Sequence, residues 1–148
     1  VIGWTRRSYP GRSEEMGFPL VSLEELLSTS DIISLHLPLT EDTRGFLGES
    51  ELSKVKPGSL LINTARAELV DTPAMIRLLE SGQLAGAGID VYDEEPLPAN
   101  HPLIGLPNVI LTPHIGFNTQ EAIQNILKIA IDNVSNFFRG NITNKVLP

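Results

Sequence analysis

The sequence contains no cysteine, and this absence limits the chemistry open to the chain. Without thiols there is no disulfide framework and no thiolate metal site, which suits the cytoplasmic location that we expect. We also expect no bound metal. Basic residues are also few, because 11 Lys and Arg stand against 18 Asp and Glu, for a net charge of −7. Nucleic acids and anionic membranes require a basic face, so we expect neither as a partner.

Long apolar runs are missing as well. No stretch approaches the roughly 18–20 residues of a membrane helix, and no basic segment leads into an apolar one as in a signal peptide. The 148 residues, 41% of them hydrophobic, are enough for one domain with a hydrophobic core. These properties are typical of a globular protein.

Short apolar runs alternate with helical patterns along the chain. The runs that predict strands are residues 1–4, 31–37, 59–63, 87–91 and 108–112. The segments that predict helices start at a capping box of Ser22 and Glu25, at Glu49, at Asp71 or Thr72, and at a capping box of Asn118 and Glu121. Gly82 and Gly140 are expected to end the last two helices. This alternation predicts an α/β fold, an open parallel sheet with helices on both faces and strands buried on both faces.

Arg66, Glu95 and His114 each follow the end of a different predicted strand. Ligands bind beyond the carboxyl ends of the strands in an open parallel sheet, so we expect these side chains to line one crevice. A guanidinium binds a carboxylate through two hydrogen bonds, and an imidazole supported by a carboxylate transfers protons near neutral pH. Taken singly, each residue would more often have a loop or surface role. Together they predict an anion-binding acid/base site.

Four segments carry a family resemblance. In chain order they are HLPLTEDTRGFLG, LINTARAELVD, GAGIDVYDEEP and NVILTPHIGFNTQEA. Together they resemble the D-isomer-specific 2-hydroxyacid dehydrogenases, and the resemblance covers residues 1–140. It implies an incomplete Rossmann-like, doubly wound sheet, and an enzyme that transfers a hydride between NAD(P)H and a 2-oxo acid to give a D-2-hydroxy acid. Glyoxylate and hydroxypyruvate are the substrate types to test.

The resemblance also implies roles for single residues. Arg66 corresponds to the arginine that binds the substrate carboxylate and carbonyl, and Glu95 to the glutamate that pairs with the acid/base, here His114. Asp90 resembles the residue that contacts the nicotinamide carboxamide. Further cofactor contacts are implied for Leu37, Pro38, Thr43, Thr64, Ala65 and Gly116. The family usually has glycine after this arginine, whereas Ala67 stands here and its methyl group could narrow the approach of substrate.

The turn Thr5-Arg6-Arg7-Ser8 bears on the choice of cofactor. Dehydrogenases that use NAD commonly have an acid at this place for the ribose hydroxyls, and here Thr5 stands instead. Two arginines and a hydroxyl suit a 2′-phosphate, so we expect NADP to be favoured over NAD. The alternative is a basic surface turn.

The family pattern includes a segment that this sequence does not contain. Family members carry a GxGxxG loop after the first strand, and none precedes Val1. We therefore expect residues 1–140 to be a nucleotide-binding domain without its first strand and glycine-rich loop, and residues 141–148 to be a tail returning towards a missing substrate domain. We expect the fragment alone to be inactive and the complete protein to be a homodimer. A nucleotide-sensing corepressor of the same fold and an inactive fragment remain as alternatives.

Overall fold

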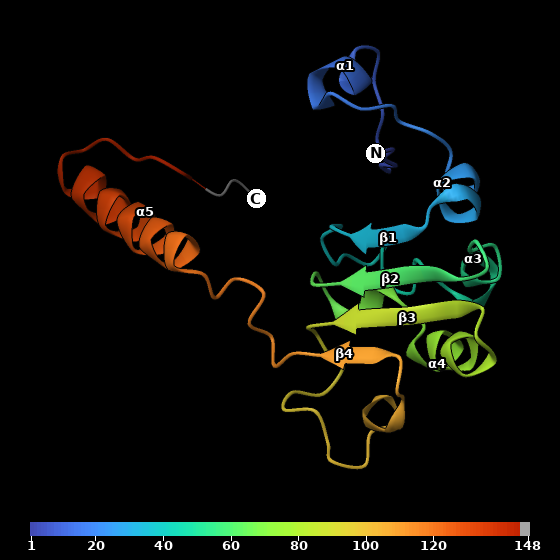
Figure 1. The fold of residues 1–148 in the computed structure, drawn as a ribbon. Helices are drawn as coiled ribbons and strands as arrows, with labels where there is room; N and C mark the ends of the chain where they lie inside the picture. The colour runs from blue at the N-terminus through green and yellow to red at the C-terminus, as the bar shows by residue number, and fades with distance from the viewer. Residues whose placement is uncertain (146–148) are drawn as a thin grey trace. The chain divides into compact units, whose positions relative to one another are not determined.

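A computed structural model describes residues 1–145, and the chain divides into two compact units, one up to Pro113 and one from His114. In chain order, the elements are α1 (Arg12–Met16), α2 (Leu23–Thr29), β1 (Ile32–Leu35), α3 (Glu49–Leu52), β2 (Ser59–Asn63), the 3₁₀ helix η1 (Ala67–Leu69), α4 (Thr72–Ser81), β3 (Leu84–Ile89), the 3₁₀ helix η2 (Pro102–Gly105), β4 (Val109–Leu111) and α5 (Gln120–Phe138) (Figure 1). All except α5 belong to the first unit.

The first unit is built on a four-stranded sheet. Its strands lie in the order β1-β2-β3-β4, and every neighbouring pair is parallel (Figure 1). Parallel strands need crossover connections, and the connections here contain α3, α4 and η2. The predicted parallel α/β fold is therefore confirmed.

One face of this sheet forms the hydrophobic core. In the strand register, Ile33 pairs with Leu61 and Leu61 with Ala87, and all three are at most 6% exposed. Helices α2 to α4 contribute further buried side chains, namely Leu27, Leu52, Ala74, Met75 and Leu79. Burial of these apolar side chains fixes the register, since a slip by one residue would turn the whole row outward.

The opposite face of the sheet differs from the prediction. Ile32, Leu60 and Ile110 are 61%, 37% and 72% exposed, so the strands alternate between buried and exposed positions. The expectation that every strand is buried on both faces does not hold for this unit. Continuous apolar runs predicted it, but a run of apolar residues does not require that a neighbouring element covers both of its faces.

The predicted strand at residues 1–4 is also corrected. It is reduced to one parallel bridge between Gly3 and Leu20, with the Gly3 amide donating to Pro19 O at 2.9 Å and the Val21 amide donating to Gly3 O at 2.9 Å. Trp4 stacks on Phe46, with ring centroids 4.8 Å apart, and so contacts the segment that follows β1.

The helix boundaries follow their capping residues. The Ser22 and Asp71 side chains accept hydrogen bonds from the amides three residues ahead and begin α2 and α4, as predicted. Gly82 ends α4 with φ 77°, a left-handed conformation that glycine adopts without strain. Helix α5 begins one residue later than expected, because Thr119 rather than Asn118 caps it.

The second unit contains α5, which runs for 19 residues. It has the predicted apolar repeat, but within this unit those side chains are exposed, among them Ile126, Leu127, Val134, Phe137 and Phe138. In the described part of the chain, no helix is both long and apolar enough to cross a membrane. The domain boundary expected at residue 140 remains a prediction, and the expected tail at 141–148 lies partly outside the described residues.

Candidate functional site

The turn after β2 is shaped by Asn63, the last residue of the strand, whose side chain is 2% exposed. Its Oδ1 accepts a hydrogen bond from the Ala65 amide at 3.0 Å, and its Nδ2 donates to Arg66 O at 2.9 Å. One buried amide therefore satisfies a backbone donor and a backbone acceptor of the turn. This arrangement holds Thr64, Ala65 and Arg66 at the carboxyl end of β2.

Arg66 itself lies on the surface at this end of the sheet. Its Nη1 donates to Ala65 O at 2.6 Å, which turns the guanidinium back over its own turn. A guanidinium has five N–H donors, so one backbone contact leaves it capable of a bidentate contact with an anion. Ala67, which follows, is 7% exposed and begins η1, so its methyl group is packed inside the turn.

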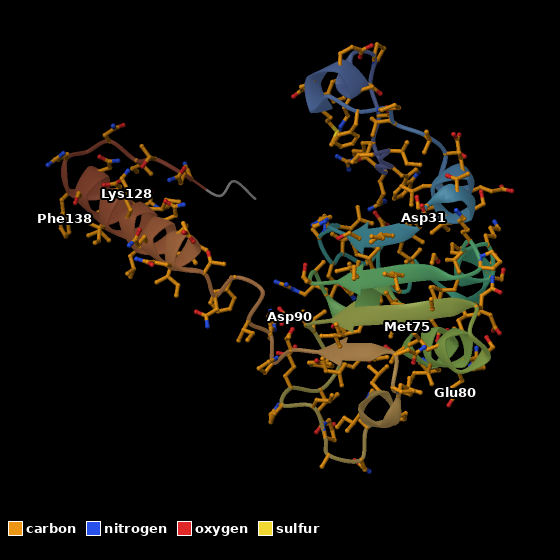
Figure 2. All side chains as sticks on the ribbon, in the orientation of Figure 1. Asp31, Met75, Glu80, Asp90, Lys128 and Phe138 are labelled. Atoms are coloured by element: carbon orange, nitrogen blue, oxygen red, sulfur yellow. The ribbon has the colours of Figure 1, made fainter. Side chains whose placement is uncertain are left out.

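Side chains at and around Asp90 join the ends of β3 and β4. Figure 2 shows Asp90 beside the arrowhead ends of the strands. Asp90 is 3% exposed, and its Oδ1 accepts a hydrogen bond from Thr112 Oγ1 at 2.5 Å. The Tyr92 hydroxyl lies 3.0 Å from Ile89 O and 2.9 Å from Thr112 O. The Asp90 amide donates to Asn63 O at 3.0 Å, so the ends of β2, β3 and β4 form one hydrogen-bonded group.

Glu95 is exposed and lies in the loop after β3. Its Oε1 accepts a hydrogen bond from the Tyr92 amide at 3.1 Å, which ties the carboxylate to the beginning of its own loop. Burial raises the pKa of the Tyr92 hydroxyl, and the negative charges of Asp90 and Glu95 raise it further. Tyr92 is therefore neutral and can donate a hydrogen bond to the carbonyls at the strand ends.

His114 and Gly116 belong to the second unit, and the three proposed catalytic residues therefore come from both units. His114 has φ 55°, a left-handed conformation that a residue with a side chain rarely adopts. Such local conformations are over-represented at functional sites. Arg66, Asp90 and Glu95 lie within the first unit.

The segment after β1 carries three of the predicted cofactor contacts, Leu37, Pro38 and Thr43. Thr43 is 0% exposed; its Oγ1 lies 2.7 Å from Pro38 O and accepts from the Thr40 amide at 2.8 Å. Its hydroxyl thus fixes the conformation of the loop. Leu37 is half-buried and packs against the core.

The turn at residues 5–7 faces this loop. Arg6 forms an ion pair with Asp42 at 2.8 Å, and both side chains are more than a third exposed. Arg7 is exposed, and its carbonyl accepts a hydrogen bond from Arg12. A cleft of about 460 Å³ lies between residues 1–5 and β1, and both Thr5 and Leu37 line it.

Sequence reasoning missed Asn63, Thr112 and Tyr92, although each stands beside a predicted site residue. A signal was present, because a polar residue at the end of an apolar strand has to satisfy its hydrogen bonds where the chain leaves the sheet. His36 and His101 have local partners: His36 Nε2 lies 2.9 Å from Ser34 Oγ, and His101 Nδ1 accepts from the Leu103 amide at 3.2 Å.

Residues 1–116 match the family model of the D-isomer specific 2-hydroxyacid dehydrogenases, NAD binding domain. The chain is 45% identical over 142 residues to a glyoxylate reductase of Thermococcus litoralis, a match that covers 96% of the chain and 43% of that protein. An acyclic imino acid reductase in complex with NADPH and D-Arg superposes with TM-score 0.86 and 35% identity, over 99% of this chain and 46% of that one. The NAD-complexed D-isomer specific 2-hydroxyacid dehydrogenase of Lactobacillus delbrueckii ssp. bulgaricus superposes with TM-score 0.85 and 31% identity, over 100% of this chain and 48% of that one. The chain thus spans less than half the length of these relatives.

Proposed function

Since this chain belongs to the D-isomer specific 2-hydroxyacid dehydrogenases, as part of their NAD binding domain, we propose that the complete protein reduces a 2-oxo acid to a D-2-hydroxy acid with NAD(P)H. The observation that carries the proposal is the hydrogen-bonded group at the carboxyl ends of β2, β3 and β4. It holds the backbone of Arg66, the buried Asp90 carboxylate and the Glu95 loop at one edge of one sheet.

The residues present fit a nicotinamide cofactor. The cleft of about 460 Å³ beside Thr5 and Leu37 lies within the size range of small-molecule sites. Thr5 lines this cleft and the positively charged Arg6 and Arg7 follow it in the chain, while the buried Asp90 carboxylate offers an acceptor just past the end of β3. When bound, the cofactor supplies the hydride, and the protein supplies binding, orientation and charge.

Each proposed catalytic residue has one task. Arg66 binds the substrate carboxylate and polarises the C2 carbonyl with its remaining N–H donors. His114 delivers the proton to the C2 oxygen as hydride arrives at C2, so the carbonyl becomes a hydroxyl group. Glu95 stabilises the imidazolium before that proton leaves. The assignment of His114 and Glu95 rests on the family resemblance.

The test is NADH and NADPH oxidation by the complete protein with glyoxylate, hydroxypyruvate and pyruvate. We expect turnover with at least one of them and a raised KM for the 2-oxo acid in Arg66→Gln, because its anchor is lost. His114→Gln is expected to lower kcat by about 10²–10⁴-fold, the usual contribution of a general acid. A protein that binds NAD(P)H but reduces no 2-oxo acid would contradict the proposal.

We also propose that NADPH is preferred to NADH. Thr5 offers no negative charge to a 2′-phosphate, and a charge-assisted contact from Arg6 or Arg7 contributes about 1.5–3 kcal/mol, roughly 10–100-fold in affinity. The neighbour solved with NADPH supports this choice, although the one solved with NAD has a similar fold. Asp42 competes for Arg6, so Asp42→Asn is expected to increase the preference.

The measurement is kcat/KM for both cofactors. Arg6→Ala combined with Arg7→Ala is expected to remove most of the preference for NADPH. Arg77→Ala is the matched control, because it also breaks an exposed Arg–carboxylate ion pair, with Glu49 at 3.2 Å on α3. Equal values for the two cofactors in the unsubstituted protein would refute this part of the proposal.

We further propose that the complete protein is a homodimer, as the family resemblance implies. The absence of cysteine supports a cytoplasmic location, and the net charge of −7 argues against nucleic-acid and membrane partners. Light scattering of the complete protein tests the oligomeric state, and a monomer at micromolar concentration would contradict it.

A further inference from the structure

The buried Asp90 carboxylate has a short contact with a hydroxyl group from the neighbouring strand. Thr112 Oγ1 donates to Asp90 Oδ1 at 2.5 Å, and Asp90 is 3% exposed. The hydroxyl of Thr112 is the donor in this contact and the carboxylate oxygen is the acceptor, so the hydroxyl proton points at Asp90. Hydrogen bonds to a charged group are the short, strong ones. The contact therefore favours one orientation of the carboxylate.

Thr112 is well suited to set that orientation. Its backbone is held from both sides, since the Thr112 amide donates to Ile89 O at 3.0 Å and Thr112 O accepts from the Tyr92 hydroxyl at 2.9 Å. The donor is thus fixed before any ligand arrives.

We propose that Thr112 is a positioning residue for cofactor binding, which acts by orienting the Asp90 carboxylate towards the nicotinamide carboxamide. The inference rests on the proposed function for the identity of the ligand. An amide N–H₂ donates to a carboxylate, and a carboxylate held in one rotamer loses less conformational entropy when it accepts that bond. Thr112 itself touches no cofactor atom in this scheme.

The experiment compares three variants of the complete protein by the dissociation constants of NADH and NADPH, measured from nicotinamide fluorescence. Thr112→Val keeps the shape and removes the hydroxyl, and it is expected to weaken cofactor binding by about tenfold. Thr112→Ser keeps the hydroxyl and is expected to stay within about twofold of the unsubstituted protein. Thr72→Val is the matched control, because it removes another Thr–Asp hydrogen bond, the 3.2 Å contact with Asp93, at the surface.

Two outcomes overturn the proposal. One is unchanged cofactor binding by Thr112→Val in a protein whose thermal unfolding shows an intact fold. The other is a Thr112→Ser variant as weak as Thr112→Val, because the hydroxyl would then not be the group that matters. If the unsubstituted protein binds no NAD(P)H, the proposed function fails, and crystal structures of the variants decide the positioning role. An Asp90 carboxylate that rotates in Thr112→Val but not in Thr112→Ser supports it, and an unmoved carboxylate overturns it.

Discussion

Replacement of Asn63 by alanine tests how the turn that carries Arg66 is held. The change removes two hydrogen bonds, one from the Ala65 amide at 3.0 Å and one to Arg66 O at 2.9 Å. A typical hydrogen bond contributes about 0.5–1.5 kcal/mol net, so the pair contributes about 1–3 kcal/mol. The Asn63 backbone keeps its contact with the Asp90 amide, so the sheet itself is retained.

The assay is urea unfolding of the 148-residue chain, with the free energy of unfolding obtained by linear extrapolation. Asn63→Ala is expected to lower it by about 1–3 kcal/mol. Asn108→Ala is the matched control, because this part-buried side chain donates one hydrogen bond, to Leu79 O at 3.2 Å, away from the turn. About half the loss is expected there.

The reasoning is refuted if Asn63→Ala destabilises the chain no more than Asn108→Ala does. Water would then replace the Asn63 side chain as the hydrogen-bond partner of the Ala65 amide and of Arg66 O without loss of stability. The turn would hold its shape through its backbone alone. In the complete protein, the same substitution is expected to raise the KM for the 2-oxo acid more than that for NAD(P)H, because Arg66 is the substrate anchor in the proposed mechanism.

Two other substitutions follow from particular contacts. Gly86→Ala places a methyl carbon 2.8 Å from the backbone oxygen of Asn108 and is expected to cost about 1–3 kcal/mol in urea unfolding; Gly105→Ala, where a methyl group meets nothing within 4 Å, should be near neutral. The raised pKa of Tyr92 means that its contribution to stability is complete below pH 10.0 and is lost as pH rises through the folded-state value. Unfolding free energies measured across pH 10.0 are therefore expected to fall less steeply in Tyr92→Phe than in the unsubstituted chain, and equal slopes would contradict this.

Local signals predicted much of the first unit. Ser59–Asn63 is the strand that the sequence indicated, since the turn pair at Pro57-Gly58 marks its beginning. The Asp71 cap and Gly82 likewise mark the two ends of α4, because both act through hydrogen bonds within a few residues. Such features depend on neighbours in the chain, and a single sequence contains them.

Features that depend on distant partners could not be predicted in the same way. Residues 1–4 have strand-forming composition, yet the one β-bridge that they form within the described residues joins Gly3 to Leu20, so no strand results. Ile110 is as apolar as a core residue but is 72% exposed, because its face of the sheet is uncovered in this unit. The sequence predicts only a strand position for Thr112, since its contact with Asp90 spans 22 positions of sequence.

The order of the four strands across the sheet is the same as their order along the chain. Each strand therefore pairs with the one synthesised just before it, through connections at residues 36–58, 64–83 and 90–108. Loop-closure entropy grows only slowly with length, so these three steps carry similar entropic costs. These four strands can therefore add to the sheet one at a time during synthesis on the ribosome. Each new strand finds its pairing partner already made.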